Sequence, residues 1–434
     1  MKAVAQKQYI RTGSLLHRSS EEHLYGAYAK PQLYWAELPI RLREWLICQF
    51  ILNEYVTAAI NGETDLSQGI GVRNICYRFF MPFARYWLAP KTAFDIMSTV
   101  KGETAAGKLV LSLQKKHINY LDIMEALHAA EPILKSPPAG TNFARRTIHV
   151  DCRTPCATVR NVFRKSLDLD SEAVSIYLHG SYADGERTAF SDIDDLVVVH
   201  AAAWRNAKTF ETVIKSLERV SRAFQLNDPL QHHGHIMLLG YDLNLLDQGL
   251  IHSRVLQDST CLLGDRPLTY NVWEDHRGLR NNVLTLAQEL RANGLLLANN
   301  AIQSFGLKQL VSAISLLPAL VMQCHGIEVD KASAITQARR YFSPNAAWAL
   351  DWASGVRKHW NLIANGHHHM AMKNIFPYLP FRRRPLETLS KRYSDHIDVS
   401  IVCKDISHVI ASIFRLSDDC VDMSHCNVLH DQPQ

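Results

Sequence analysis

The sequence predicts an α+β fold, with a small mixed β-sheet in the middle of the chain and helical regions on either side of it. Residues 174–179 and 196–199 are apolar runs of strand length, separated by a polar loop. Before and after this stretch, apolar residues recur at three- and four-residue spacings, which is typical of helices that bury one face. The strands are therefore expected in one central domain and the helices at both ends.

The N-terminal region, residues 1–140, is expected to be helical. Leu42 and Leu46 belong to a stripe with the helical period, and a further helix is expected at 74–87. Two prolines and a glycine within 137–140 interrupt the helical pattern, since these residues favour turns and loops. The first domain boundary is therefore placed at residue 140.

The central domain is expected to span residues 141–270. After the two strands, a helix is expected at about 204–224, and it returns the chain to a further strand at 236–239. The C-terminal part, 271–434, is expected to form a helical bundle. Its clearest helix carries an apolar stripe that Pro318 should kink or end.

Length and composition are those of a globular protein of two or three domains. The formal net charge of +5 suits anionic substrates but is too small to indicate nucleic-acid binding by itself. The nine cysteines form no regular framework, which favours reduced thiols and a cytoplasmic location. No uninterrupted apolar run approaches membrane-spanning length, so no membrane association is expected.

The residues that carry chemistry lie at the ends of the two central strands. Gly180 and Ser181 follow the first strand, where exposed backbone N–H groups and a hydroxyl can hold a phosphate. Asp192 and Asp194 begin the second strand, and strand alternation places both on one face. Two carboxylates this close repel each other unless a hard divalent cation lies between them, which indicates Mg²⁺. Alternation points Asp195 away from the pair, toward a basic neighbour or a sheet edge.

The Gly180-Ser181 pair, the short loop and the Asp192-Ile193-Asp194 segment together resemble the signature of the DNA polymerase β-like nucleotidyltransferase superfamily. The resemblance implies a small mixed-sheet nucleotidyltransferase domain. It implies transfer of NMP from an NTP to an acceptor hydroxyl with release of pyrophosphate. Asp192 and Asp194 would hold Mg²⁺, with Mn²⁺ as an alternative ion, while Gly180 and Ser181 would bind the nucleotide.

A third carboxylate that the family often has on the next strand is absent from 236–239. His235 or His233 is the candidate for the missing role, because an imidazole with a pKa of about 6.5 can act as a general base near neutral pH. A purely structural role for these imidazoles is an equal alternative. In the helical bundle, Lys308 or Lys331 is expected to reach the triphosphate, as a helical-domain lysine does in several relatives; a solvated lysine is the simpler alternative.

Several other interpretations stay open. The acceptor is expected to be a small molecule or a protein rather than a long nucleic acid. The first alternative is a degenerate domain that binds nucleotide as a sensor or interaction module, and the second is an enzyme that modifies RNA. The basic clusters at 78–87 and 382–384 are the only support for nucleic-acid binding. Histidines and cysteines near 149–156, 367–369 and 420–430 lack the spacing of a structural zinc module.

Overall fold

The structure is a computed structural model that describes the strand at 77–79, most residues from 145 to 360, and residues 405–425. Within 145–360 the longest gaps are 153–162 and 225–234. Contacts divide the chain into two units. The sheet unit comprises the described residues of Met1–Ala183, Ile193–Phe224 and His233–Glu274, and the helical unit comprises those of Asp184–Asp192 and Asp275–Gln434.

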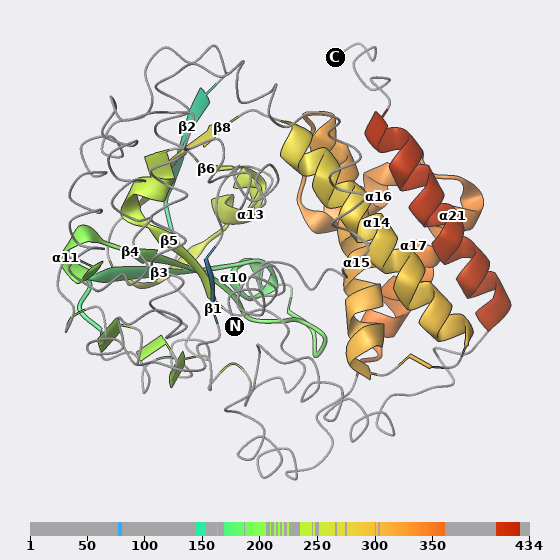
Figure 1. Cartoon of the computed structure of the whole chain (residues 1–434), viewed down its shortest axis with the longest axis horizontal. Coiled ribbons are helices and arrows are strands. Elements are labelled where there is room, and N and C mark those ends of the chain that lie inside the picture. Colours follow the sequence, from blue (N-terminus) through green and yellow to red (C-terminus); the bar gives the residue numbers. More distant parts are fainter. Residues whose placement is uncertain are drawn as a thin grey trace, which may run out of the picture. The chain divides into compact units, whose positions relative to one another are not determined.

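A five-stranded mixed sheet forms the centre of the sheet unit (Figure 1). Its strands, in spatial order, are β1 (Tyr77–Phe79), β5 (His235–Leu239), β4 (Asp194–Val199), β3 (Val174–His179) and β7 (Thr260–Leu263). The first three strands run parallel to one another, whereas β3 is antiparallel to both β4 and β7. This sheet, together with the helices that follow it in the chain, confirms the α+β class.

The register between β3 and β4 decides which side chains share a face. It pairs Val174 with Val199 at one end and His179 with Asp194 at the other. Directly opposed residues of an antiparallel pair project to the same side, so His179 and Asp194 lie on one face. Every residue of β3 is buried, because both faces of the sheet are covered.

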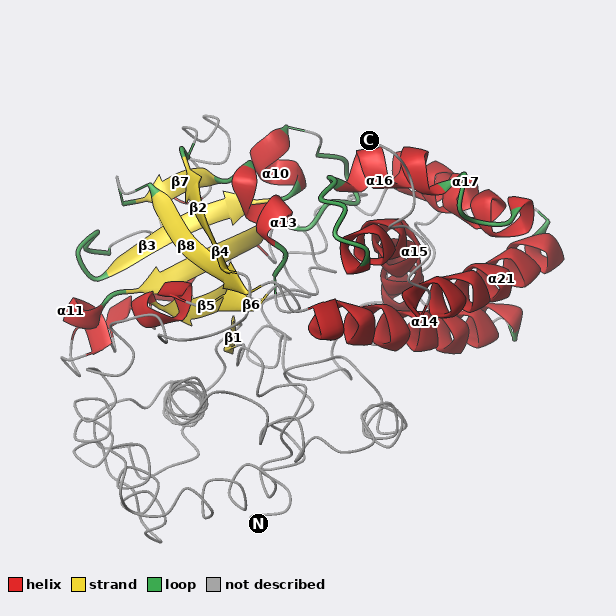
Figure 2. Ribbon diagram, turned by 90° about the horizontal axis from the view of Figure 1, so that it is seen from above, coloured by secondary structure: helices red, strands yellow, loops and turns green. Residues whose placement is uncertain are grey.

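A second, three-stranded sheet packs on one of these faces, as Figure 2 shows. It contains β2 (Arg145–Val150), β8 (Leu268–Trp273) and β6 (Leu246–Asp247). Ile148 and Val150 of β2 belong to the same buried cluster as Leu196 and Val198 of β4. The same unit includes the one-turn helix α10 (Ser181–Asp184), α11 (Ala201–Trp204), the 3₁₀ turn η2 (Gly240–Asn244) and α13 (Ser253–Gln257).

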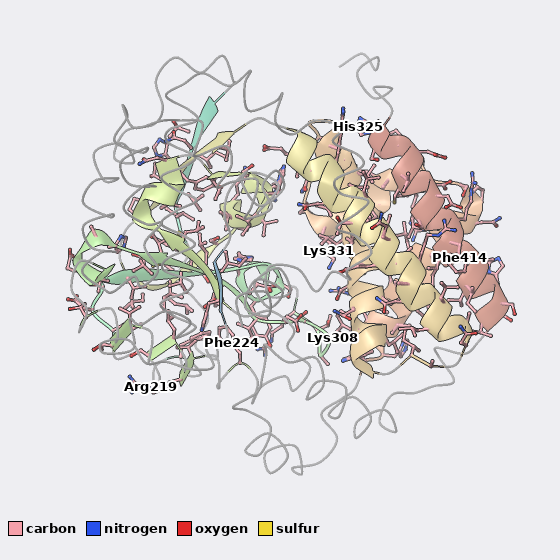
Figure 3. All side chains as sticks on the ribbon, viewed as in Figure 1. Arg219, Phe224, Lys308, His325, Lys331 and Phe414 are labelled. Atoms are coloured by element: carbon pink, nitrogen blue, oxygen red, sulfur yellow. The ribbon has the colours of Figure 1, made fainter. Side chains whose placement is uncertain are left out.

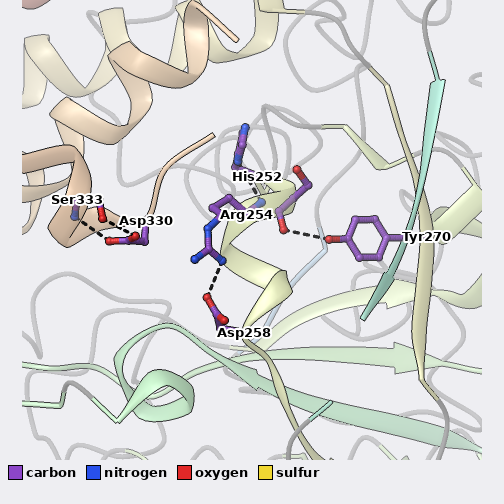
Figure 4. Close-up of polar contacts among 7 residues, drawn as sticks. His252, Arg254, Asp258, Tyr270, Asp330 and Ser333 are labelled. Atoms are coloured by element: carbon purple, nitrogen blue, oxygen red, sulfur yellow. Dashed lines mark hydrogen bonds and ion pairs between the residues drawn. The ribbon is translucent and has the colours of Figure 1, made fainter. Parts of the chain in front are cut away.

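Polar contacts fix α13 within this unit (Figure 4). His252 caps the helix by accepting a hydrogen bond from the Arg254 backbone N–H at 3.2 Å. The Arg254 guanidinium pairs with the Asp258 carboxylate one turn later, at 2.5 Å. The buried Tyr270 hydroxyl donates to the Ser253 carbonyl at 3.0 Å, which ties α13 to β8.

The helical unit contains five long or medium helices among its described residues. They are α14 (His276–Ala298), α15 (Ser304–Cys324), α16 (Lys331–Ala338), α17 (Pro344–Lys358) and α21 (Ile406–His425). Asp330 caps α16 by accepting from the Ser333 backbone N–H at 2.7 Å, a contact also drawn in Figure 4. The expected stripe of α15, which includes Leu310 and Leu317, is fully buried in the core of this unit.

Two features of helix α15 concern the expectations made for it. Pro318 lies inside the helix, which continues to Cys324, so the helix does not end at the proline. The segment Gly306–Cys324 is also long and apolar enough to cross a membrane by length and composition alone, with a mean hydropathy of 1.4. However, 78% of this segment is buried in the structure, as expected of the central helix of a bundle.

The expectations for the N-terminal region fall on residues outside the described ones, except at 77–79. Here the predicted helix at 74–87 is wrong, because Tyr77–Phe79 form β1, which pairs in parallel with β5. Pairing with a distant strand overrides the local helical pattern. At the other end of the sheet unit, β8 extends to Trp273, beyond the division expected at residue 270.

A buried ion pair links neighbouring strands of the large sheet. Asp195 of β4 and His235 at the start of β5 are both fully buried, and His235 Nδ1 lies 2.7 Å from Asp195 Oδ2. His235 Nε2 lies 2.9 Å from the carbonyl oxygen of Leu217. A carbonyl only accepts, so Nε2 carries a proton, and the carboxylate favours a second proton on Nδ1. This geometry indicates an imidazolium ion.

The charge of His235 follows from two opposing effects. Burial by itself lowers its pKa, but the Asp195 carboxylate and the hydrogen bonds to Asp195 and Leu217 raise the pKa more, so the net change is upward. A raised pKa in the folded state means that the pair stabilises the fold fully below the unfolded pKa of about 6.5. This contribution disappears as the pH rises through the folded pKa.

We therefore expect the free energy of unfolding to fall as the pH rises above about 6.5, and Asp195→Asn to flatten this fall. Urea unfolding of the wild type and the variant across this range measures the effect. Asp258→Asn, which alters a partly exposed ion pair, is the control and should keep the wild-type slope. Equal slopes for the wild type and Asp195→Asn would contradict the imidazolium assignment.

Candidate functional site

The turn after β3 requires glycine at position 180. Gly180 has φ of +66°, a backbone conformation that costs other residues about 1–2 kcal/mol. A Cβ at this position would also lie only 3.3 Å from Asp194 Oδ2. The backbone at Gly180 therefore approaches the Asp194 carboxylate closely. Ser181 follows as the first residue of α10 and is half-buried.

Asp194 is the first residue of β4 and belongs to the sheet unit. Its directly opposed partner on β3 is His179, which is 5% exposed. Among the residues that the structure describes, neither ring nitrogen of His179 has a hydrogen-bond partner, and burial lowers its pKa to about 4, against the opposite effect of the Asp195 charge. The residue opposite Asp194 on β3 is therefore an uncharged imidazole at neutral pH.

The loop between the two halves of the signature belongs to the helical unit, from Asp184 to Asp192. Short-range hydrogen bonds shape it: the Thr188 backbone N–H donates to Ser191 Oγ at 3.0 Å, and the Ser191 N–H donates to the Thr188 carbonyl at 3.1 Å. This turn buries the side chain of Phe190 in the core of the helical unit. The position of Asp192 is thus set by the helices and not only by β4.

Asp192 forms a buried ion pair with Lys308 of α15. The Lys308 Nζ donates to Asp192 Oδ1, and the two side chains are 0% and 7% exposed. Figure 3 labels Lys308 on α15, and Lys331 at the start of α16. The alternative of a solvated lysine is therefore wrong for Lys308. Its expected contact with a triphosphate stays a prediction, since the structure gives Lys308 the role of a counter-ion.

Two cations and a tryptophan surround the Phe190 ring. The Lys308 Nζ lies 5.6 Å and the Arg357 Cζ 4.8 Å from the ring centroid, both within cation–π range. Trp360 meets the same ring edge-on, with centroids 5.0 Å apart. Phe190 thus docks the signature loop onto the ends of α15 and α17.

The expectation that both aspartates lie in one strand holds only for Asp194. Strand β4 begins at Asp194, so Asp192 lies in the segment before it. Ile193 between them is buried against Leu178 and Phe224 in the sheet unit. Asp192 and Asp194 therefore flank the residue at which the chain passes from the helical unit into the sheet unit.

The expected general base has a different role in the structure. Both ring nitrogens of His235 are engaged, by Asp195 and by the Leu217 carbonyl, so His235 has no free nitrogen with which to accept a proton. This placement corrects the catalytic role and gives His235 a structural one. It also identifies the basic neighbour of Asp195. The other candidate, His233, lies outside the described residues.

The donor atoms at the signature suit a hard cation. Asp192 and Asp194 offer carboxylate oxygens, which are the ligands that Mg²⁺ and Mn²⁺ prefer. Among the residues that the structure describes, no group of three or more histidines, cysteines, aspartates or glutamates is arranged as a metal site. Asp192 and Asp194 would thus supply two of the six or more oxygen ligands that such an ion takes.

Residues 159–231 match the family model of the nucleotidyltransferase domain. The matched segment contains Gly180, Ser181, Asp192 and Asp194, so the match confirms the resemblance seen in the sequence and is consistent with a polymerase β-like nucleotidyltransferase. It supports nucleotidyl transfer as the general activity. Neither the curated proteins nor the solved structures contain a match to this chain.

Sequence reasoning missed two residues near the signature. Arg357 and Phe190 carry no motif, and their relevance appears only because the fold brings α17 against the signature loop. A signal was present for Phe190, because a large aromatic side chain inside a polar loop is expected to be buried.

One prediction from this site concerns the Gly180 turn. We expect Gly180→Ala to destabilise the protein by about 1–2 kcal/mol through its positive φ. Because the new methyl group would also displace the Asp194 carboxylate, we expect nucleotidyl transfer to fall roughly ten- to a hundredfold. Gly326→Ala is the matched control, since Gly326 has φ of +74° but nothing within 4 Å of its Cβ position. Equal activities of the two variants would contradict the role of the close approach.

Another prediction concerns the Lys308–Asp192 pair. Removing one partner of a buried ion pair leaves the other charge uncompensated, so we expect Lys308→Met to cost about 3–5 kcal/mol of unfolding free energy. Adding Asp192→Asn should restore much of this loss. Urea unfolding in EDTA measures both variants. Lys358→Met, at an exposed position of α17, is the control and should cost less than about 0.5 kcal/mol. A Lys308→Met variant as stable as this control would refute the pairing.

Proposed function

We propose that the protein is a nucleotidyltransferase that transfers NMP from an NTP to an acceptor hydroxyl and releases pyrophosphate. The observation that carries this proposal is the family match over residues 159–231, which contain both halves of the signature. The approach of the Gly180 backbone to the Asp194 carboxylate adds support, because it brings the phosphate-binding turn next to a metal-binding group. Asp192 and Asp194 would hold the Mg²⁺, or Mn²⁺ in its place.

In the proposed reaction, the backbone after Gly180 and the Ser181 hydroxyl bind the phosphates of the NTP. Mg²⁺, when bound, neutralises the developing charge on the phosphoryl oxygens. The acceptor oxygen attacks the α-phosphorus, and a new O–P bond forms. The bond from the α-phosphorus to the oxygen that bridges to the β-phosphorus breaks, pyrophosphate leaves with that electron pair, and the hydroxyl proton passes to solvent. Gly180, Ser181 and the two aspartates act by positioning and electrostatics.

The acceptor is proposed to be a small molecule or a protein. The net charge of +5 over 434 residues gives little electrostatic attraction for a long nucleic acid. The basic cluster at 382–384 lies outside the described residues, and so do the side chains of 78–87.

A second candidate is a domain that binds NTP without transferring NMP and acts as a sensor. The observations that favour it are the engaged nitrogens of His235 and the neutralisation of Asp192 by Lys308. Against it, the family match over residues 159–231 contains Asp192 and Asp194 together with Gly180 and Ser181.

The deciding experiment incubates the purified full-length protein with each α-³²P-labelled NTP and Mg²⁺, with and without cell extract. We expect pyrophosphate release and a labelled product from the wild type. Asp192→Asn and Asp194→Asn should each lower transfer by about a hundredfold or more, since each removes a metal ligand. The size of the labelled product identifies the class of acceptor.

A control variant and a contrary outcome make the result specific. Asp258 belongs to a partly exposed ion pair of α13, so Asp258→Asn should leave transfer unchanged. An NTP that binds to the wild type without yielding pyrophosphate or a labelled product in any extract would refute the transferase and favour the sensor.

A further inference from the structure

Charged side chains of the helical unit gather around Phe190. Asp192 contributes one carboxylate, whereas Lys308 and Arg357 contribute two cations. The Lys308 ammonium pairs with the Asp192 carboxylate. The Arg357 guanidinium is a second cation beside this pair.

The Arg357 side chain forms no hydrogen bond or ion pair with any residue that the structure describes. Its contacts are the Phe190 ring at 4.8 Å and a longer-range attraction to Asp192. Burial lowers its pKa, and the Asp192 charge acts in the opposite direction. By contrast, Arg254, Arg291, Arg339 and Arg415 each pair with an aspartate. Arg357 is thus a half-buried cation whose hydrogen-bond donors are unused.

An unpaired guanidinium that is removed from water is costly unless an anion binds it. The Arg357 Cζ lies over the Phe190 ring, and Arg357 lies in the last turn of α17. A planar guanidinium held in this way presents parallel N–H donors, which match the oxygens of a phosphate group. Arg357 also experiences the charge of Asp192, which is an expected metal ligand. The anion that fits both groups is a phosphate that also binds a divalent cation.

We propose that Arg357 binds the triphosphate of the donor nucleotide. Arg357 belongs to α17, and its contact with Phe190 places it beside the signature loop. This inference rests on the proposed function and names a further residue of the same site. It also predicts how Phe190 acts: the ring positions the guanidinium and does not touch the substrate.

The structural alternative is that Arg357 only packs against Phe190. The two roles differ in what a conservative change does. Arg357→Lys keeps a cation for the Phe190 ring but loses the paired N–H donors of the guanidinium. Arg357→Gln loses the charge altogether while keeping a polar side chain of moderate length. If packing alone matters, the two variants change stability and leave phosphate binding at the wild-type level.

The test measures binding to the full-length protein by isothermal titration calorimetry in the presence of Mg²⁺. The probes are ATP, GTP, CTP, UTP, inorganic tripolyphosphate and a short single-stranded oligonucleotide. Arg357→Gln loses charge-assisted hydrogen bonds to the phosphates. We therefore expect its affinity for tripolyphosphate, and for the NTP that the wild type binds, to fall roughly ten- to a hundredfold. Arg357→Lys should lie between this variant and the wild type. Arg340→Gln is the matched control, because Arg340 is exposed and also stacks on an aromatic ring, that of Tyr341, at 4.7 Å.

The outcomes separate this inference from the proposed function. Wild-type NTP affinity in a folded Arg357→Gln variant, or a loss of affinity for the oligonucleotide alone, would overturn the inference. NMP transfer by the wild type would still support the proposed function in that case. Conversely, weakened tripolyphosphate binding by Arg357→Gln without any transfer by the wild type would support the inference and refute the transferase. Thermal unfolding verifies that Arg357→Gln is folded, and Arg357→Lys replaces it as the deciding variant if it is not.

Discussion

The arrangement of the signature depends on the buried ion pair between Asp192 and Lys308. A carboxylate that is removed from water needs a counter-charge, and α15 supplies it from 116 residues further along the chain. The pair places Asp192 with the helical unit, while the next strand begins only two residues later in the sheet unit. Helix α15 therefore contributes directly to the position of Asp192, which is one of the two proposed metal ligands.

A consequence of this pairing is that Asp192 and Asp194 are held by different means. Asp192 is fixed by a cation and by the docked Phe190 side chain, whereas Asp194 is fixed by the β3–β4 register and by the backbone of Gly180. Asp194 lies opposite His179 on β3, whose imidazole is uncharged at neutral pH. The two carboxylates differ in electrostatic environment although they stand two residues apart.

The second buried pair, Asp195 with His235, shows how a catalytic assignment can fail. A histidine at the start of a strand, close to two aspartates, has the right pKa for a general base, and the sequence offers no means to exclude this role. In the structure its nitrogens bind Asp195 and the Leu217 carbonyl. The pair therefore gives His235 a structural role in the sheet.

Local pattern by itself determined much of this protein. The β-branched runs predicted β3 and β4, the Gly-Ser and Asp-x-Asp spacing predicted the family, and the apolar stripe predicted the buried face of α15. These features depend on residues that are close in sequence, where side-chain period and turn chemistry act directly. The tertiary structure alone decided the partners of Lys308, Asp195 and Arg357, and it made 77–79 a strand. Those outcomes depend on which distant charges and strands meet, because ion pairing and sheet pairing act through space and leave no periodic trace in the sequence.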